Sequence, residues 1–231
     1  MVGMRHFASA TNGVDIQHSI TIMGGREVSR PYQVWFFAEG ELFFMFLFQS
    51  PSIFPLNLQE PFSLIVLDHH PDMQRPQWEG VVSCGGWVTD VLENNPFVRN
   101  VIIVGASDKL IQEVPIHLRE KVMFYSQAEI DHHQAWPSKA GKLIHEPVYI
   151  SIDKDVLRKQ DAVTDWTNGD MTLLQLQAVL RIIYAHEEVI GVDITGECSA
   201  TLDYLSEVRS ASVNSKANEE LMQMILSETT D

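Results

Sequence analysis

Short apolar runs recur along the chain and alternate with longer amphipathic segments. The runs are rich in valine and isoleucine, and most are apolar at nearly every position, which is typical of parallel strands that helices cover on both faces. The pattern predicts strands over six ranges: 32–37, 63–67, 100–106, 121–126, 147–152 and 188–194. This alternation predicts an α/β fold, a three-layer αβα sandwich with a mostly parallel sheet.

The strongest helix signal lies at 171–186, "MTLLQLQAVLRIIYAH". Its Thr172 and Gln175 have the spacing of a capping box, and its apolar residues keep a helical period. Weaker signals predict three further features: a helix within 81–95, a long loop over 127–146 and a final helix over 217–228.

The composition is that of a globular, acidic protein. With 231 residues, 45% of them hydrophobic, the chain can bury one substantial core, so we expect residues 1–231 to form a single domain. Sixteen Lys and Arg against 31 Asp and Glu give a formal net charge of −15, which argues against a nucleic-acid partner. Most of this acidity fits a solvated surface, but some carboxylates could bind cations.

The remaining bulk features predict a soluble, cytoplasmic protein. Cys84 and Cys198 are too few for a disulfide framework. The most apolar segment, 34–48, is broken by Glu39, Gly40 and Glu41, so its pieces are far shorter than the roughly 20 residues of a membrane span. The first residues lack the apolar core of a signal peptide. We therefore expect no membrane partner, and the sequence is compatible with a homo-oligomer.

Acidic side chains follow three of the predicted strands directly. In α/β folds, functional sites gather at the carboxyl ends of the strands. A single such cluster could be a turn, but carboxylates brought together by several strands would repel one another unless a cation lies among them. Alternate residues of an extended segment share a face, so Asp68 with His70, and Asp153 with Asp155, could each reach one centre. Asp193 and Glu197 follow the third strand.

Two of these strand ends resemble family motifs. The stretch 68–72, "DHHPD", resembles the Asp-x-His-x-Asp motif of the arginase/agmatinase (ureohydrolase) family, and 151–155, "SIDKD", resembles its Ser-x-Asp-x-Asp motif. The resemblance is clearest over 62–198 and implies the arginase–deacetylase fold. It implies a site for one or two manganese ions, with zinc or another divalent ion as the alternative. The implied metal ligands are Asp68, His70, Asp72, Asp153 and Asp155, with Asp68 and Asp153 shared between the ions.

The resemblance also implies an activity. In a ureohydrolase, a metal-activated hydroxide attacks a C–N bond of a small, cationic guanidine or amidine substrate. The corresponding catalytic residues would be Asp68, His70, Asp153 and Glu197. Two alternatives stay open: a deacetylase-like metal amidohydrolase, and a catalytically impaired protein that retains metal as a scaffold.

The chain departs from the family pattern in three places. Phe43 and Phe44 stand near the expected position of an upstream ligand histidine, for which the distant His18 is the alternative. A second, proton-transfer histidine is also missing; Cys84 lies near its place and is interpreted as a packing residue, with a thiolate ligand or nucleophile as the alternative. Gly196 holds the place of a substrate-binding glutamate. Glu197, which follows it, could act instead or could be an exposed loop acid.

Other polar and aromatic residues are less specific. His69 is expected to point away from His70 and to serve the turn or support the ligands. The sequence Asp131-His132-His133 is expected to be a solvated loop, because adjacent side chains seldom converge on one ion. Four tryptophans could line a pocket or simply pack: Trp78, Trp87, Trp136 and Trp166.

Overall fold

The computed structural model describes residues 20–23, 33–34, 58–75, 83–131, 144–198 and 204–229. Their strands form one seven-stranded sheet with the order β2-β1-β7-β6-β3-β4-β5. The strands are β1 (Ile20–Met23), β2 (Gln33–Val34), β3 (Phe62–Leu67), β4 (Val98–Val104), β5 (Met123–Tyr125), β6 (Val148–Asp153) and β7 (Val189–Thr195). The single-domain organisation of residues 1–231 stays a prediction.

Five neighbouring strands of the sheet are parallel. β3 pairs in parallel with both β4 and β6, β4 with β5, and β6 with β7. At the other edge, β1 runs antiparallel to β7 and to β2. The predicted mostly parallel sheet is therefore confirmed. The strand expected over 32–37 is described only at β2, and β1 lies in a stretch where no strand was predicted.

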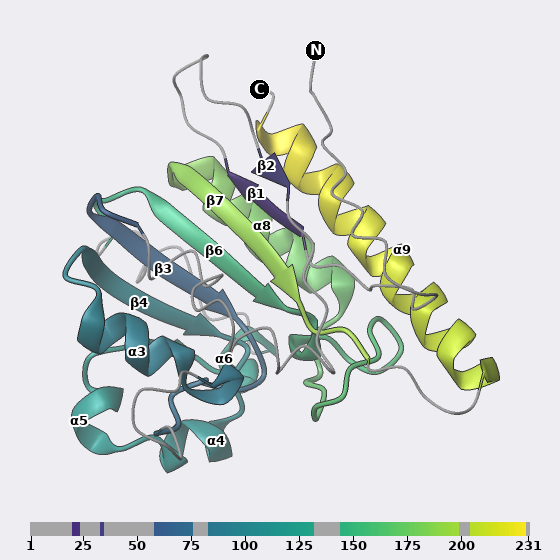
Figure 1. Cartoon of the computed structure of the whole chain (residues 1–231), viewed down its shortest axis with the longest axis horizontal. Coiled ribbons are helices and arrows are strands. Elements are labelled where there is room, and N and C mark those ends of the chain that lie inside the picture. The colour runs from purple at the N-terminus through teal and green to yellow at the C-terminus, as the bar shows by residue number, and fades with distance from the viewer. Residues whose placement is uncertain are drawn as a thin grey trace, which may run out of the picture.

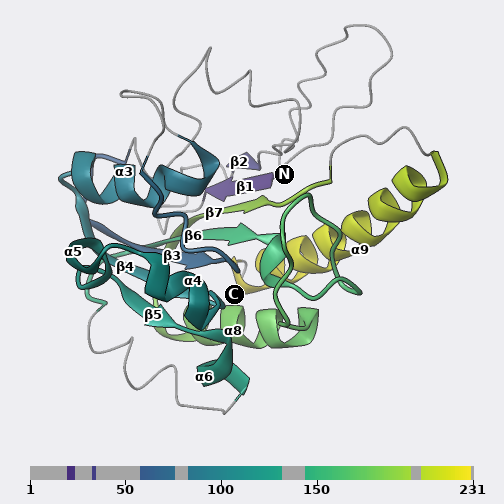
Figure 2. The ribbon, with the colours of Figure 1, turned by 90° about the horizontal axis from the view of Figure 1, so that it is seen from below.

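Helices cover both faces of the sheet, as Figures 1 and 2 show. α3 (Trp87–Asn94) lies on one face, and α8 (Leu173–His186) and α9 (Tyr204–Thr229) lie on the other. Successive residues of β3 divide between the two cores: Val66 packs in the cluster of Trp87, and Leu67 in the cluster of Leu176. This division requires strands that are apolar on both faces, and it confirms the three-layer sandwich.

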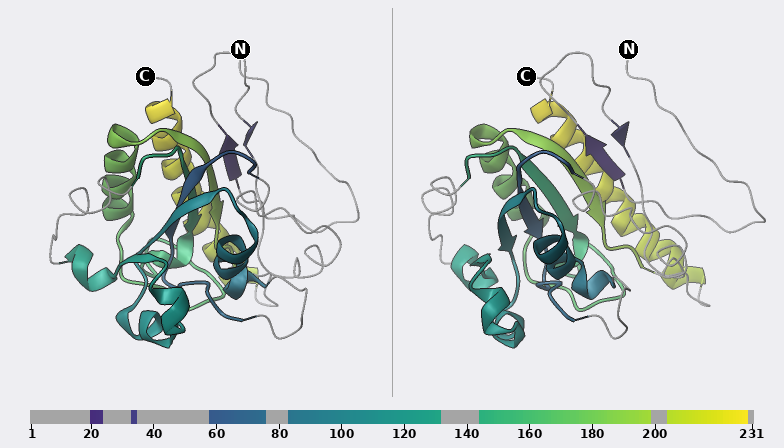
Figure 3. Two further views of the ribbon diagram at one scale, coloured as in Figure 1. Left: turned by 90° about the vertical axis from the view of Figure 1, so that its left-hand side faces the viewer. Right: turned by 60° about the vertical axis from the view of Figure 1, so that its left-hand side comes forward.

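α8 and α9 lie next to each other behind the sheet (Figure 3). α8 begins at the predicted capping box, in which the Thr172 hydroxyl accepts from the Gln175 N–H and the Gln175 side chain accepts from the Thr172 N–H. The predicted final helix is confirmed, but α9 begins at Tyr204 rather than 217. None of the helices within the described ranges combines the length and hydrophobicity that a membrane span requires.

Between β4 and β6, the described residues form three short helices: α4 (Asp108–Glu113), α5 (Ile116–Arg119) and α6 (Gln127–Asp131). The prediction of a long loop over 127–146 is therefore wrong at its start, where α6 lies. The Glu129 carboxylate accepts from the Ser126 N–H at 3.0 Å, and the Ser126 hydroxyl accepts from the Glu129 N–H at 3.4 Å. This reciprocal pair is a capping box, a helix-start signal present in the sequence.

Candidate metal centre

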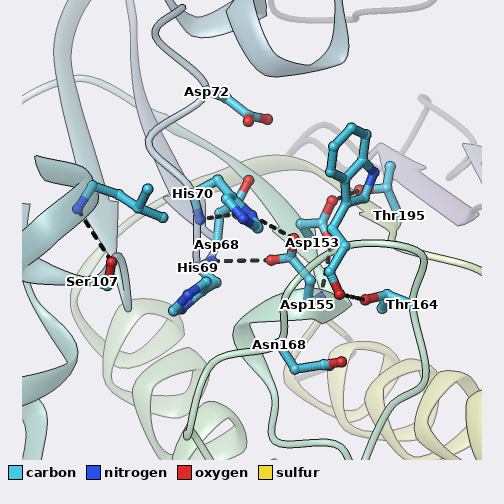
Figure 4. A network of polar contacts seen from close by, with 12 residues as sticks. Asp68, His69, His70, Asp72, Ser107, Asp153, Asp155, Thr164, Asn168 and Thr195 are labelled. Carbon is cyan, nitrogen blue, oxygen red and sulfur yellow. Dashed lines mark hydrogen bonds and ion pairs between the residues drawn. The ribbon is translucent and has the colours of Figure 1, made fainter. Parts of the chain in front are cut away.

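The candidate site lies where β3, β6 and β7 end side by side. Leu67 pairs with Ile152, and Asp153 pairs with Thr195, so the segments that follow these strands leave the same edge of the sheet. The strand-end carboxylates are therefore brought together by the parallel order of the sheet, as Figure 4 shows.

Within the described ranges, one group of three side chains offers metal-ligand atoms that lie within 4.8 Å of one another: Asp68, His70 and Asp155. Nδ1 of His70 lies 2.7 Å from Oδ2 of Asp155 and 3.6 Å from Oδ1 of Asp68. Both carboxylates are buried, and the imidazole is partly open. Three of the five expected ligands thus converge, while their role as ligands stays a prediction.

Backbone amides orient these carboxylates. The His70 N–H donates to Oδ1 of Asp68 at 2.6 Å, and the His69 N–H donates to Oδ1 of Asp155 at 3.1 Å. His69 therefore supports a candidate ligand through its backbone. Backbone N–H groups therefore hold one oxygen of each carboxylate, which favours a preformed site.

Asp153 and Asp72 lie outside the group of three. Asp153 caps the short helix η2 (Lys154–Val156), because its Oδ1 accepts from the Asp155 N–H at 2.8 Å. Asp72 has a positive φ of 50° and accepts a 2.8 Å hydrogen bond from Nε1 of Trp87. Figure 4 places Asp72 apart from the other acids. Their roles as ligands stay predictions.

Burial makes the charged forms of these acids unfavourable. It raises the pKa of Asp68, and it raises the pKa of Asp72 well above the ordinary value, with the charges of the other acids adding to the effect. Burial and the charge of a neighbouring aspartate raise the pKa of Asp153 and of Asp155 to about 7. The pKa of His70 is lowered by burial, but its hydrogen bonds to Asp155 and Asp68 outweigh this and raise it to about 10.

A buried ion pair lies beside the cluster and was not predicted. Lys154, which is fully buried between the two aspartates of its motif, pairs with Glu197 and donates to Oδ1 of Asn218 at 2.9 Å. The side-chain amides of Asn214 and Asn218 in α9 donate to Glu197 at 2.8 and 2.9 Å. Glu197 is therefore a buried residue and not an exposed loop acid. Its catalytic role stays a prediction.

The conformation of Gly196 explains why an acid cannot occupy that position. Gly196 has a φ of 83°, and a Cβ there would collide with Oδ1 of Asp153 and with the backbone of Lys154.

Asp193 in β7 accepts from the Tyr149 hydroxyl at 2.9 Å and from the Ser151 hydroxyl at 2.7 Å. These bonds join β6 to β7, and burial raises the pKa of Asp193 to about 6.

Of the other candidate residues, the structure describes Cys84 and Trp87, while several others lie outside the described ranges. Cys84 is exposed at the start of η1 (Cys84–Gly86), so its interpretation as a packing residue is wrong. Trp87 is buried and also binds Asp72, a role for which the sequence held no signal. Several residues named above lie outside the described ranges: His18, Phe43, Phe44, Trp78, His132, His133 and Trp136.

Comparison with known proteins identifies the family. A model of the arginase family matches residues 47–222, so the chain belongs to this family and the resemblance of the motifs is confirmed. The chain is 33% identical over 144 residues to an uncharacterized protein of Thermotoga maritima, a match that covers 61% of the chain and 50% of that protein.

Two solved structures share the fold. Agmatine ureohydrolase of Thermoplasma volcanium has a TM-score of 0.58 at 16% identity, covering 76% of this chain and 57% of that one. Formimidoylglutamase from Bacillus subtilis has a TM-score of 0.55 at 17% identity, covering 74% and 55%. The chain thus spans about half the length of the relatives it matches.

The donor set fits a divalent metal ion. Two carboxylates and one imidazole nitrogen converge, and this mixture suits manganese, zinc and related ions. Both carboxylates are buried. The charge of Asp153 raises the pKa of Asp68, and the charge of Asp68 raises the pKa of Asp155, a repulsion that a cation would remove. Family membership and this geometry together support a divalent-metal site at Asp68, His70 and Asp155.

Proposed function

We propose that the protein is a metal-dependent hydrolase of the ureohydrolase type, acting on a C–N bond of a small guanidine- or amidine-like substrate. The observation that carries the proposal is the convergence of Asp68, His70 and Asp155 at the carboxyl edge of an arginase-family sheet. Manganese is the proposed ion. When bound, a divalent cation supplies the positive charge that activates water and polarises the substrate.

The residues of the chain have distinct tasks in this proposal. Asp68, His70 and Asp155 hold the ion, while the backbone N–H groups of His69 and His70 fix the directions of the two carboxylates. In the metal-free protein, Nδ1 of His70 bears a proton and lies between the carboxylates of Asp155 and Asp68. His70 loses this proton when the ion binds. Asp72 and Asp153 are the proposed further ligands. The acidic cluster and the net charge of −15 favour a cationic substrate.

The direct test combines metal analysis with substrate panels. Protein purified with manganese should contain near-stoichiometric metal and should release urea or ammonia from at least one guanidine or amidine. An acetyl-amine panel, assayed with manganese and with zinc, should give no acetate. Acetate release would favour a deacetylase-like enzyme. Stoichiometric metal without turnover of either panel would favour a metal-retaining scaffold and contradict the proposal.

Metal binding should release protons and tighten as the pH rises. The acids near pKa 7 and His70 near pKa 10 must lose their protons before they bind the ion. We expect about two protons released per ion at pH 7 and nearly three at pH 6, and hence about a 300-fold gain in affinity from pH 6 to pH 7. Titration calorimetry in buffers of different ionisation enthalpy measures both quantities.

The same groups predict the stability of the metal-free protein. Asp153 and Asp155 have a higher pKa folded than unfolded, so the folded state binds more protons and stability falls as the pH rises from about 4 to 7. His70 extends this loss from about pH 6.5 to 10. With chelator present, the thermal midpoint should be lower at pH 8 than at pH 5.5, and manganese should reverse the loss. If the thermal midpoint in chelator is the same or higher at pH 8 than at pH 5.5, this prediction of pH-dependent stability is wrong.

A further inference from the structure

Trp166 lies beside the candidate metal site and is largely open to solvent. Its ring centroid is 6.3 Å from that of His70, and the two ring planes meet at 68°. The side chain is 53% exposed. Burying a large apolar side chain normally stabilises a fold, so a tryptophan held in solvent at this position forgoes much of that gain.

The loop that carries Trp166 is fixed at both ends. On one side, Asn214 of α9 accepts from the Val163 N–H at 2.8 Å and donates to the Val163 carbonyl at 2.7 Å. On the other side, the Asn168 side chain donates to the Leu157 carbonyl at 2.9 Å. The exposure of the indole is therefore a property of an ordered loop, which reduces the entropy lost when a ligand binds.

The loop also packs directly on the segment of the candidate ligands. The Gly169 N–H donates to the Asp155 carbonyl at 2.7 Å. A Cβ on Gly169 would lie 2.6 Å from the Val156 carbonyl oxygen and 3.1 Å from Nδ1 of His69, so a larger residue would push the loop away. Trp166 is thus positioned relative to the same segment that holds Asp155.

The chemistry beside the cluster favours a cation at the indole. Glu197, which could act in place of the family's substrate-binding glutamate, is buried in its pair with Lys154. Gly196, which holds the place of that glutamate, has no room for a side chain. An exposed indole can supply attraction instead, because the face of a tryptophan ring attracts cations and stacks well with flat, delocalised ones.

We propose that Trp166 is a substrate-binding residue whose indole face holds the flat cationic group of the substrate beside His70. The proposal rests on the proposed function for the class of substrate. It assigns recognition of the cation to an aromatic ring on the loop between η2 and α8 rather than to a carboxylate after β7.

The test is equilibrium binding of two matched probes to manganese-loaded protein, measured by calorimetry. The probes are n-butylguanidinium and the neutral n-butylurea. In Trp166→Ala, n-butylguanidinium should bind about 3- to 30-fold more weakly, Trp166→Phe should be intermediate, and the affinity for n-butylurea should change by no more than about twofold. Ile116→Ala on α5, a similarly exposed apolar position, should match the wild type. Manganese content should be equal in all four proteins.

Three results would overturn the role of Trp166: unchanged n-butylguanidinium affinity in Trp166→Ala, equal weakening of both probes, or no binding of n-butylguanidinium by the wild type. Failure of the proposed function looks different. Binding that depends on Trp166 in a protein that turns over no amidine would support the residue and refute the hydrolase. Amidine turnover with the same KM in wild type and Trp166→Ala would support the hydrolase and refute the residue.

Discussion

If the protein is the proposed manganese-dependent hydrolase, Asp155→Asn is expected to remove tight manganese binding and hydrolytic activity together. Asp155 supplies one of the three converging ligand atoms, and it is held by the His69 N–H on one oxygen while the other lies 2.7 Å from His70. Asparagine keeps the shape and can still accept from the His69 N–H, but it lacks the charge. Loss of residues that only support metal ligands weakens affinity by 10- to 100-fold, so loss of a ligand should exceed about 100-fold.

The measurement is manganese titration of the chelated protein, with the thermal midpoint as a second readout. Manganese should raise the midpoint of the wild type by mass action and should leave that of Asp155→Asn unchanged. Asp131→Asn, at the end of α6, is the matched control and should behave as the wild type. If the two substitutions have equal effects on manganese affinity, the metal site lies elsewhere.

Of the single substitutions proposed, Lys154→Met is expected to lower the free energy of unfolding most. The Lys154 side chain is fully buried, and it pairs with Glu197, which α9 holds through Asn214 and Asn218. Methionine preserves most of the apolar stem but leaves the Glu197 carboxylate buried without its cation. Breaking a buried ion pair in this way lowers the free energy of unfolding by about 3 to 5 kcal/mol. Urea unfolding at pH 7 measures the change.

Two variants make this prediction specific. Lys216→Met removes an exposed lysine whose Nζ lies 3.8 Å from Glu220, and it should change the free energy of unfolding by no more than about 0.5 kcal/mol. The double variant Lys154→Met/Glu197→Leu should recover most of the loss, because it removes both buried charges. If the free energy of unfolding of Lys154→Met lies within about 1 kcal/mol of the wild-type value, the ion pair contributes little to stability.

The sequence determined the class of fold and the place of the candidate site. Strands that are apolar at successive positions must be covered on both faces, so the runs that became β3, β4 and β6 predicted a parallel sheet between helices. Strand-end position then predicted which acids would meet, since the carboxyl ends of parallel strands share one edge. These inferences rest on local pattern, which a single sequence carries in full.

The tertiary structure decided which of these residues converge and what each one contacts. Asp153 and Asp155 have the same spacing as Asp68 and His70, yet only Asp155 belongs to the group of three, while the Asp153 side chain accepts from the Asp155 N–H at the start of η2. The partner of Lys154 is Glu197, 43 residues away, because β6 and β7 are adjacent and α9 covers their ends. Such contacts depend on how distant segments pack, and no spacing along the chain encodes them. The same is true of the Trp87 hydrogen bond to Asp72 and the position of Trp166 beside His70.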